Sequence, residues 1–237
     1  MGTSKGYLPP TGYLWPEAKR DVTGMVKNGF TPSSIGKAVS SFSKAMGDGG
    51  KSYSGSVAKI GTKAVNFIEA VKSYGFFDAL EKVGLSHLRG QSSEGLRSGL
   101  LEYFNDSGSD FYGSVAQQSM SELMRELLKS AEDEDDYNNI IGSINTGEFI
   151  REFIVKFIQN CFFANFAEKI LTMFDKLDKY DIAEKSVKTY IRTSLESEFT
   201  IVDIQKVDWN GQQGNQIIAE KCNKAFEILS VWSETLV

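Results

Sequence analysis

Chemically reactive side chains are scarce in this chain. Its 237 residues include one histidine, His87, and two cysteines, Cys161 and Cys222. Because no second His and no nearby Cys accompanies His87, a metal site or a Ser/His hydrolase would have to assemble from distant residues, such as Asp106 or Asp110. We therefore expect His87 to be structural or exposed to solvent, with that cryptic hydrolase as an alternative.

Signals for export and for membrane insertion are also missing. No charged segment followed by an apolar one precedes residue 20, and both cysteines lie inside apolar helical patterns, which favours a reducing cytoplasm. The most apolar uncharged run, residues 157–167, has 11 residues, whereas a helix that crosses a bilayer needs about 18 or more. The sequence therefore predicts a cytoplasmic protein with no transmembrane helix and no membrane partner.

Motifs for catalysis and for cofactor binding are absent too. Gly50-Lys51-Ser52 has the ending of a phosphate-binding P-loop, but Ala45 occupies the place of the first glycine in that pattern. Residues 132–136 are five consecutive acids without the spacing or the glycine of a calcium loop, so we expect a solvated helix end or loop rather than a metal site. The sequence indicates a non-enzymatic protein without a cofactor or a bound metal.

Helical periodicity is what the chain does contain. Apolar residues recur at three- and four-residue intervals along most of it, and four prolines leave room for long helices. We predict a mainly α-helical, multi-helix single domain over residues 15–237, preceded by an extended N-terminal arm, residues 1–14. Within the domain we expect a Gly/Ser-rich loop at 47–56 and an acidic loop at 132–136. Residues 199–209 fit either a short strand or a continuation of the preceding helix.

One stretch, residues 147–177, is exceptionally rich in aromatic and aliphatic side chains. Their spacing is helical but covers more than one narrow stripe, which is typical of a helix covered on several sides. We therefore predict a buried aromatic helix at the centre of the fold. The residues expected in this core are Phe149, Ile150, Phe153, Ile154, Phe157, Ile158, Phe162, Phe163, Phe166, Ile170, Leu171 and Phe174.

Charge is distributed unevenly along the chain. Residues 1–72 carry ten basic and four acidic residues, a balance of +6, whereas the remainder carries 16 basic and 27 acidic residues, a balance of −11. The basic N-terminal third can simply be attracted to the acidic remainder of the same molecule. Alternatively, it makes the protein a binding module for nucleic acid, with Lys37, Lys44 and Lys51, spaced by seven, as possible phosphate contacts. The overall isoelectric point of about 5.1 weakens that alternative.

The first residues offer a further candidate site. A small residue after Met1 permits removal of the initiator methionine, which would leave Gly2 with a free and unhindered amine. Such an amine has a pKa near ~8 and is a usable nucleophile when deprotonated. The Pro9-Pro10 pair favours an extended backbone behind it. The simpler interpretation of the same residues is an ordinary terminal tail.

The opening Met1-Gly2-Thr3-Ser4, followed closely by Gly6, Tyr7, Pro9 and Pro10, resembles the start of QatB-like proteins of bacterial anti-phage defence operons. The Gly49-Gly50 loop that leads into a helix of small residues at 56–64 is similar in character. The resemblance implies three partners: a P-loop ATPase, a QueC-like 7-deazapurine enzyme and a TatD-like nuclease.

The same resemblance implies where the function lies. It makes Gly2 the residue to which a QueC-like enzyme conjugates a deazapurine after Met1 is removed. The residues behind Gly2 would then form a partner-binding arm, namely Thr3, Ser4, Lys5, Gly6, Tyr7, Pro9 and Pro10. We therefore expect a non-enzymatic defence component whose arm is presented to a modifying enzyme while its helical body docks a partner.

Overall fold

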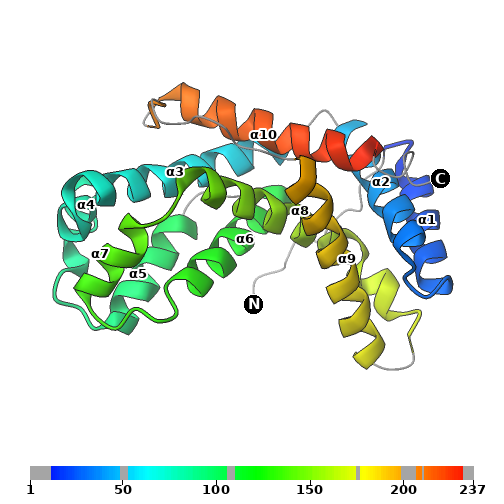
Figure 1. Ribbon diagram of the computed structural model, residues 1–237, viewed down its shortest axis with the longest axis horizontal. Coiled ribbons are helices and arrows are strands. Elements are labelled where there is room, and N and C mark those ends of the chain that lie inside the picture. The colour runs from blue at the N-terminus through cyan, green and yellow to red at the C-terminus, as the bar shows by residue number, and fades with distance from the viewer. Residues whose placement is uncertain are drawn as a thin grey trace. The chain divides into compact units, whose positions relative to one another are not determined.

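The computed structural model describes residues 12–48, 53–105, 110–174, 177–198, 207–209 and 211–231. Over these residues the chain forms ten α-helices and one short 3-10 helix, and no strand (Figure 1). The mainly α-helical, multi-helix fold predicted from the sequence is therefore confirmed. The arm up to residue 11, and residues 199–206 of the segment for which strand and helix were both considered, lie outside the described residues.

The helices from α1 to α9 follow one another with short connections, whereas 13 residues separate α9 from α10. Their bounds are α1 Trp15–Lys27, α2 Pro32–Asp48, α3 Tyr53–Tyr74, α4 Phe76–Lys82, η1 Ser86–Leu88, α5 Ser93–Asn105, α6 Phe111–Leu127, α7 Glu134–Gly142, α8 Thr146–Leu171, α9 Leu177–Glu198 and α10 Gln212–Val231. Local sequence sets several ends. Pro16 lies in the first turn of α1, where its missing N–H costs nothing, and the Asp110 side chain caps α6 by accepting from Gly113 N at 2.5 Å.

Two predicted loops are shorter than expected. Of residues 47–56, residues 47–48 end α2 and residues 53–56 begin α3, because the buried Tyr53 ring packs against Tyr112 and Phe157 and favours helix despite the neighbouring glycines. In the acidic segment, Glu134 to Asp136 form the first turn of α7. Carboxylates are favourable there because the amino end of a helix carries partial positive charge.

Contacts between Cα atoms divide the chain into two compact units. Unit 1 contains residues 1–52, 158–199 and 223–237, and unit 2 contains residues 53–157 and 200–222. Neither unit is a contiguous piece of the sequence. The predicted boundary between arm and domain at residue 15 stays a prediction.

The core of unit 1 is built around the Phe42 ring of α2. Its centroid lies 6.2 Å from that of Trp15, 5.3 Å from that of Phe162 and 5.9 Å from that of Phe166. Phe226 of α10 adds a fourth ring at 6.0 Å. Most of these pairs are edge-to-face, the arrangement that the quadrupoles of aromatic rings favour.

The core of unit 2 is built on α3. Phe67 packs edge-to-face on Phe76 and Phe104, with ring centroids 6.3 and 5.9 Å apart. At Gly61, an added Cβ would lie 2.9 Å from a methyl of Ile218 and 3.1 Å from the ring of Phe153. The glycine therefore lets three helices, α3, α8 and α10, approach closely.

The predicted aromatic helix is α8, and its side chains form core as expected. From Phe149 to Ile170, every residue named above is at most 8% exposed. The last two residues of that set differ. Leu171 is 38% exposed. Phe174 lies beyond the end of the helix and is half-buried, with its ring centroid 5.7 Å from that of Phe30. The prediction extended too far because the turn at 172–173 ends the helix before Phe174.

Candidate functional site

Of the predicted arm, the structure describes residues 12–14, which lead into the first helix of unit 1. Gly2 and residues 3–10, the predicted modification site and partner-binding residues, lie outside the described residues. Trp15, 4% exposed, packs against the rings of Phe42 and Phe166. Its backbone N–H donates to the carbonyl oxygen of Gly12 at 3.1 Å. The chain before Gly12 is therefore joined to unit 1 through a buried tryptophan.

Lys37, a predicted phosphate contact, is occupied by an interaction within the protein. Its Nζ lies 3.5 Å from Oδ1 of Asp21, whose side chain is only 4% exposed. The Ser41 hydroxyl donates to the other oxygen of Asp21 at 2.5 Å. Because a buried carboxylate needs a countercharge and hydrogen bonds, Lys37 stabilises the packing of α1 on α2.

The other two predicted phosphate contacts are not brought into a described site. Lys44 is exposed on α2, two helical turns after Lys37, and Lys51 lies outside the described residues. Residues seven apart lie on the same side of a helix, so Lys37 and Lys44 share one exposed side of α2. Whether this side contacts nucleic acid stays a prediction.

The residues proposed for a cryptic hydrolase have separate roles. His87 is exposed in η1. Asp110 caps α6 with one carboxylate oxygen and accepts from the Ser56 hydroxyl at 3.0 Å with the other. Asp106 lies outside the described residues. The structure therefore assigns Asp110 to helix capping and leaves His87 on the surface.

The structure also locates the two cysteines and shows how the acidic side chains are distributed. Cys161 and Cys222 are buried and are not joined in a disulfide, and burial raises the pKa of the Cys222 thiol. In the parts of the chain that the structure describes, no three or more His, Cys, Asp or Glu side chains gather as a metal site would require. None of the described helices is long and apolar enough to cross a membrane.

A groove of about 1020 Å³ opens in unit 2. One wall is a polar stripe of α3 that includes Asn66, Glu69 and Ser73, which are spaced by three and four residues and so face the same way. The end of α4, the connection from α7 to α8 and residues 207–209 complete the lining. Trp209, 6% exposed, packs on Gly214 at the start of α10 and closes one part of the groove.

Three groups form a hydrogen-bonded cluster in this groove. The Thr146 hydroxyl donates to Oε1 of Glu69. Lys72 Nζ lies 2.7 Å from the Thr146 oxygen and 2.9 Å from the same Glu69 oxygen. Asn145, the residue before Thr146, caps α8. Its side-chain oxygen accepts from the backbone N–H of Glu148 at 3.0 Å. The charges of Glu69 and Lys72 are thus neutralised locally.

Two other groups in the groove keep unused hydrogen-bonding capacity. The side-chain oxygen of Asn66 is buried and has no hydrogen-bond partner among the described residues. Lys82 Nζ lies 4.0 Å from the centroid of the Tyr74 ring, and no described carboxylate pairs with it. Tyr74 itself is 57% exposed, which is unusual for a large aromatic side chain.

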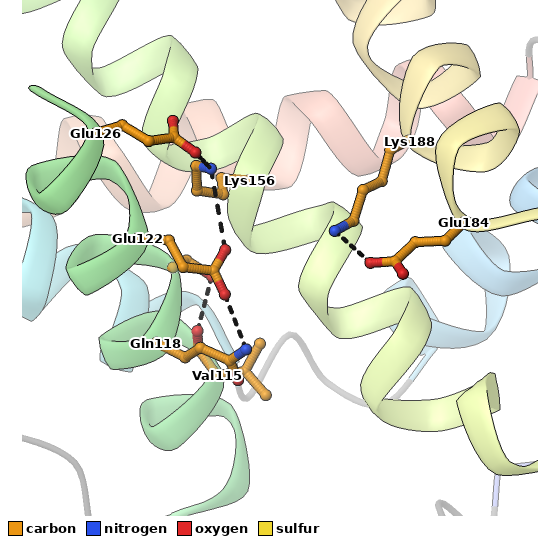
Figure 2. Close-up of polar contacts among 8 residues, drawn as sticks. Val115, Gln118, Glu122, Glu126, Lys156, Glu184 and Lys188 are labelled. Carbon is orange, nitrogen blue, oxygen red and sulfur yellow. Dashed lines mark hydrogen bonds and ion pairs between the residues drawn. The ribbon is translucent and has the colours of Figure 1, made fainter. Parts of the chain in front are cut away.

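A second charged cluster joins helices within unit 2 (Figure 2). Lys156 of α8, 15% exposed, lies 2.9 Å from Glu126 and 3.9 Å from Glu122 of α6. Gln118 donates to Glu122 at 2.9 Å and holds that carboxylate in place. In unit 1, Glu184 and Lys188 pair within α9, as Figure 2 shows. The distance between Lys188 Nζ and Glu184 Oε1 is 2.5 Å. Each of these charged groups thus has a partner of opposite charge, and we assign the pairs to stabilising the helices that carry them.

Sequence reasoning did not find the groove residues. The available signal was the polar set Asn66, Glu69 and Ser73 inside an otherwise apolar helical pattern. That signal is weak, because Thr146 and Trp209 are distant in sequence and only the fold brings them to α3.

Comparison with known proteins identifies the family. A family model described as "Qat anti-phage system associated protein QatB" matches residues 50–229. No curated protein and no solved structure is significantly similar to the chain. The match excludes residues 1–10, on which the resemblance mainly rested, and instead covers the helical body. Since it spans more than half of the sequence, the chain belongs to the QatB family and is a component of the Qat anti-phage system.

Proposed function

We propose that this protein serves the Qat system without catalysing a reaction itself. In this proposal a QueC-like enzyme attaches a deazapurine to the amine of Gly2 after Met1 is removed. The helical body docks companion proteins, among them a P-loop ATPase and a TatD-like nuclease. Membership of the QatB family is the observation that carries the proposal.

The junction between arm and body is compatible with this role. Trp15 is buried against Phe42 and Phe166, so the segment before it is joined to the core of unit 1 at a defined point. A modifying enzyme that takes up residues 2–10 would therefore not need to unfold α1. The Gly2 amine, in its deprotonated form, attacks an activated acyl carbon of the deazapurine and displaces the activating group, so that an amide bond forms as that group leaves. An ordinary α-amino group has a pKa of about 8, so a usable fraction is deprotonated at neutral pH.

Intact mass spectrometry tests the modification. When the protein is produced together with its companion proteins, we expect loss of Met1 and an added mass that fragmentation places on Gly2. Without the QueC-like enzyme, we expect the same chain with an unmodified Gly2. An unmodified Gly2 in the presence of every companion, or a retained Met1, would contradict the proposal.

Gly2→Glu is the matched control for that measurement. A large second residue prevents removal of the initiator methionine, so this variant is expected to keep Met1 and to gain no added mass. Its melting temperature is expected to equal that of the unaltered protein, because Gly2 precedes the buried anchor Trp15 by 13 positions. An adduct that persists in this variant would place the modification elsewhere.

Nucleic-acid binding is a second candidate function, favoured by the side of α2 that carries Lys37 and Lys44. If it is correct, fluorescence anisotropy with a duplex oligonucleotide should detect binding that weakens steeply with salt and that Lys44→Glu reduces. Absence of binding even at low salt would remove this candidate.

Lys37→Glu is a misleading probe of the same surface. We expect it to lower the free energy of unfolding by about 1 kcal/mol, because the new carboxylate would face the buried Asp21, while the 67% exposure of Lys37 limits the loss. A melting temperature measured for each variant separates this effect from lost binding. An unchanged melting temperature for Lys37→Glu would show that the Lys37–Asp21 pair contributes nothing.

A further inference from the structure

We propose that Tyr13 is a docking residue through which the modifying enzyme recognises this protein, and that its ring enters an apolar pocket of that enzyme. The inference rests on the proposed modification of Gly2 and names a residue that determines the specificity of that reaction. Tyr13 belongs to unit 1, and at 77% it is the most exposed of the large apolar side chains among the described residues.

The backbone on both sides of Tyr13 is held in place. The carbonyl oxygen of Gly12 accepts from the N–H of Trp15 at 3.1 Å, and that of Leu14 accepts from the N–H of Ala18 at 3.1 Å. Trp15 itself is buried against two rings of unit 1. Tyr13 therefore presents its ring to solvent from a backbone that a partner does not have to order, which lowers the entropic cost of binding.

Gly12 is part of the same geometry. A Cβ added at this position would lie 3.2 Å from the Trp15 ring and 3.5 Å from a carboxylate oxygen of Asp48 at the end of α2. Such a close approach is easiest for a residue without a side chain. It places the residue to which residues 1–11 are attached directly against unit 1.

The length of chain between Tyr13 and Gly2 argues that the occupant is the modifying enzyme. Gly2 precedes Tyr13 by 11 positions, and 11 residues span at most about 40 Å even when fully extended. An enzyme that holds the Gly2 amine in its active site therefore lies within that distance of Tyr13. A docked Tyr13 ring raises the effective concentration of the amine at that active site.

The chemistry of tyrosine defines the pocket that the ring requires. A single exposed tyrosine is ordinary on a protein surface, so it is the fixed position at the root of the arm that assigns this role to Tyr13. The ring gains free energy when it is buried against apolar side chains, whereas its hydroxyl needs a hydrogen-bond partner once it leaves water. We therefore expect an apolar pocket with a polar group at its closed end.

Kinetics of the modification test the inference. The purified QueC-like enzyme, with its deazapurine substrate in excess, is given the full-length protein from which Met1 has been removed. Intact mass spectrometry follows the added mass at increasing concentrations of the protein. We expect Tyr13→Ala to raise the KM for the protein about tenfold, which corresponds to about 1.4 kcal/mol, and to leave kcat unchanged, because the ring contributes to binding and not to the reaction at Gly2.

Two variants control for other effects. Tyr13→Phe keeps the ring and should raise KM less than Tyr13→Ala does. Tyr74→Ala removes a tyrosine ring that is 57% exposed in unit 2 and should leave KM unchanged. The melting temperature of Tyr13→Ala should equal that of the unaltered protein, because the ring is exposed. An unchanged KM for Tyr13→Ala, an equal rise for Tyr74→Ala, an effect on kcat alone or a lowered melting temperature would overturn the inference.

A longer tether provides a second readout. An insertion of about 12 glycine and serine residues before Gly12 roughly doubles the chain between Tyr13 and Gly2, which should lower the effective concentration of the amine about threefold. The insertion should therefore slow modification of the unaltered protein below saturation. In Tyr13→Ala it should have no effect, because no docked ring holds the tether. Equal slowing in both backgrounds would contradict the docking of Tyr13.

Failure of this inference and failure of the proposed function give different results. If the unaltered protein gains no mass on Gly2, the proposed modification fails and the role of Tyr13 fails with it. If the unaltered protein is modified and Tyr13→Ala is modified with the same KM, only the role of Tyr13 is refuted.

Discussion

Replacing Phe157 by Ala is expected to lower the free energy of unfolding by ~3–5 kcal/mol. Phe157 lies in the middle of α8 and is 0% exposed, with its ring 6.3 Å from that of Tyr53. The change removes buried apolar surface and leaves a cavity that close-packed neighbours refill only in part. Chemical denaturation followed by circular dichroism measures the loss, and hydrogen exchange locates it in unit 2.

Phe77→Ala is the matched control, since it makes the same change in the same unit. Phe77 is only half-buried, with its ring beside Phe76 and under the guanidinium of Arg89. Its loss should therefore be clearly smaller. If Phe157→Ala kept its solubility and its melting temperature, the central position of α8 in the core would be wrong.

Gly36→Ala is expected to destabilise the protein by about 1–3 kcal/mol, although alanine is the better helix former. A Cβ at position 36 of α2 would lie 2.5 Å from the hydroxyl oxygen of Tyr190 on α9 and 3.1 Å from the carbon that bears it. Both helices belong to unit 1, and either the Tyr190 side chain or one of the helices would have to shift. Denaturant unfolding measures the effect.

Two further variants isolate the cause. Tyr190→Phe removes the oxygen that causes the closest clash, so combining it with Gly36→Ala should recover part of the loss in a double-mutant cycle. Gly24→Ala, in α1, meets no atom within 4 Å and should instead stabilise by about 0.5–1 kcal/mol. Equal effects of Gly36→Ala and Gly24→Ala would show that α2 and α9 do not approach as closely as described.

Family membership and the proposed modification rest on different parts of the chain. The QatB match starts at residue 50 and covers the helical body, whereas Gly2 and its arm precede it. The mass measurement tests the arm, whereas binding of companion proteins tests the helical body, and neither result determines the other. The two proposed roles can therefore fail or stand separately.

Helix positions were predictable because they follow from local periodicity. The spacing of apolar residues identified the buried stretch that forms most of α8, and α1 and α2 begin next to Pro16 and at Pro32, where proline is favourable in a first helical turn. The errors lie where packing overrides local preference. Tyr53 extends α3 into a glycine-rich segment, and a turn removes Phe174 from the α8 helix.

By itself the sequence determined a helical chain, an aromatic core and a resemblance to QatB-like proteins, because each depends on residue type and spacing along the chain. Only the tertiary structure decided how the polar residues are used. It pairs Lys37 with Asp21, assigns Asp110 to a helix cap, and collects Asn66, Thr146 and Trp209 around one groove. Such contacts join residues far apart in sequence, and no local pattern specifies them.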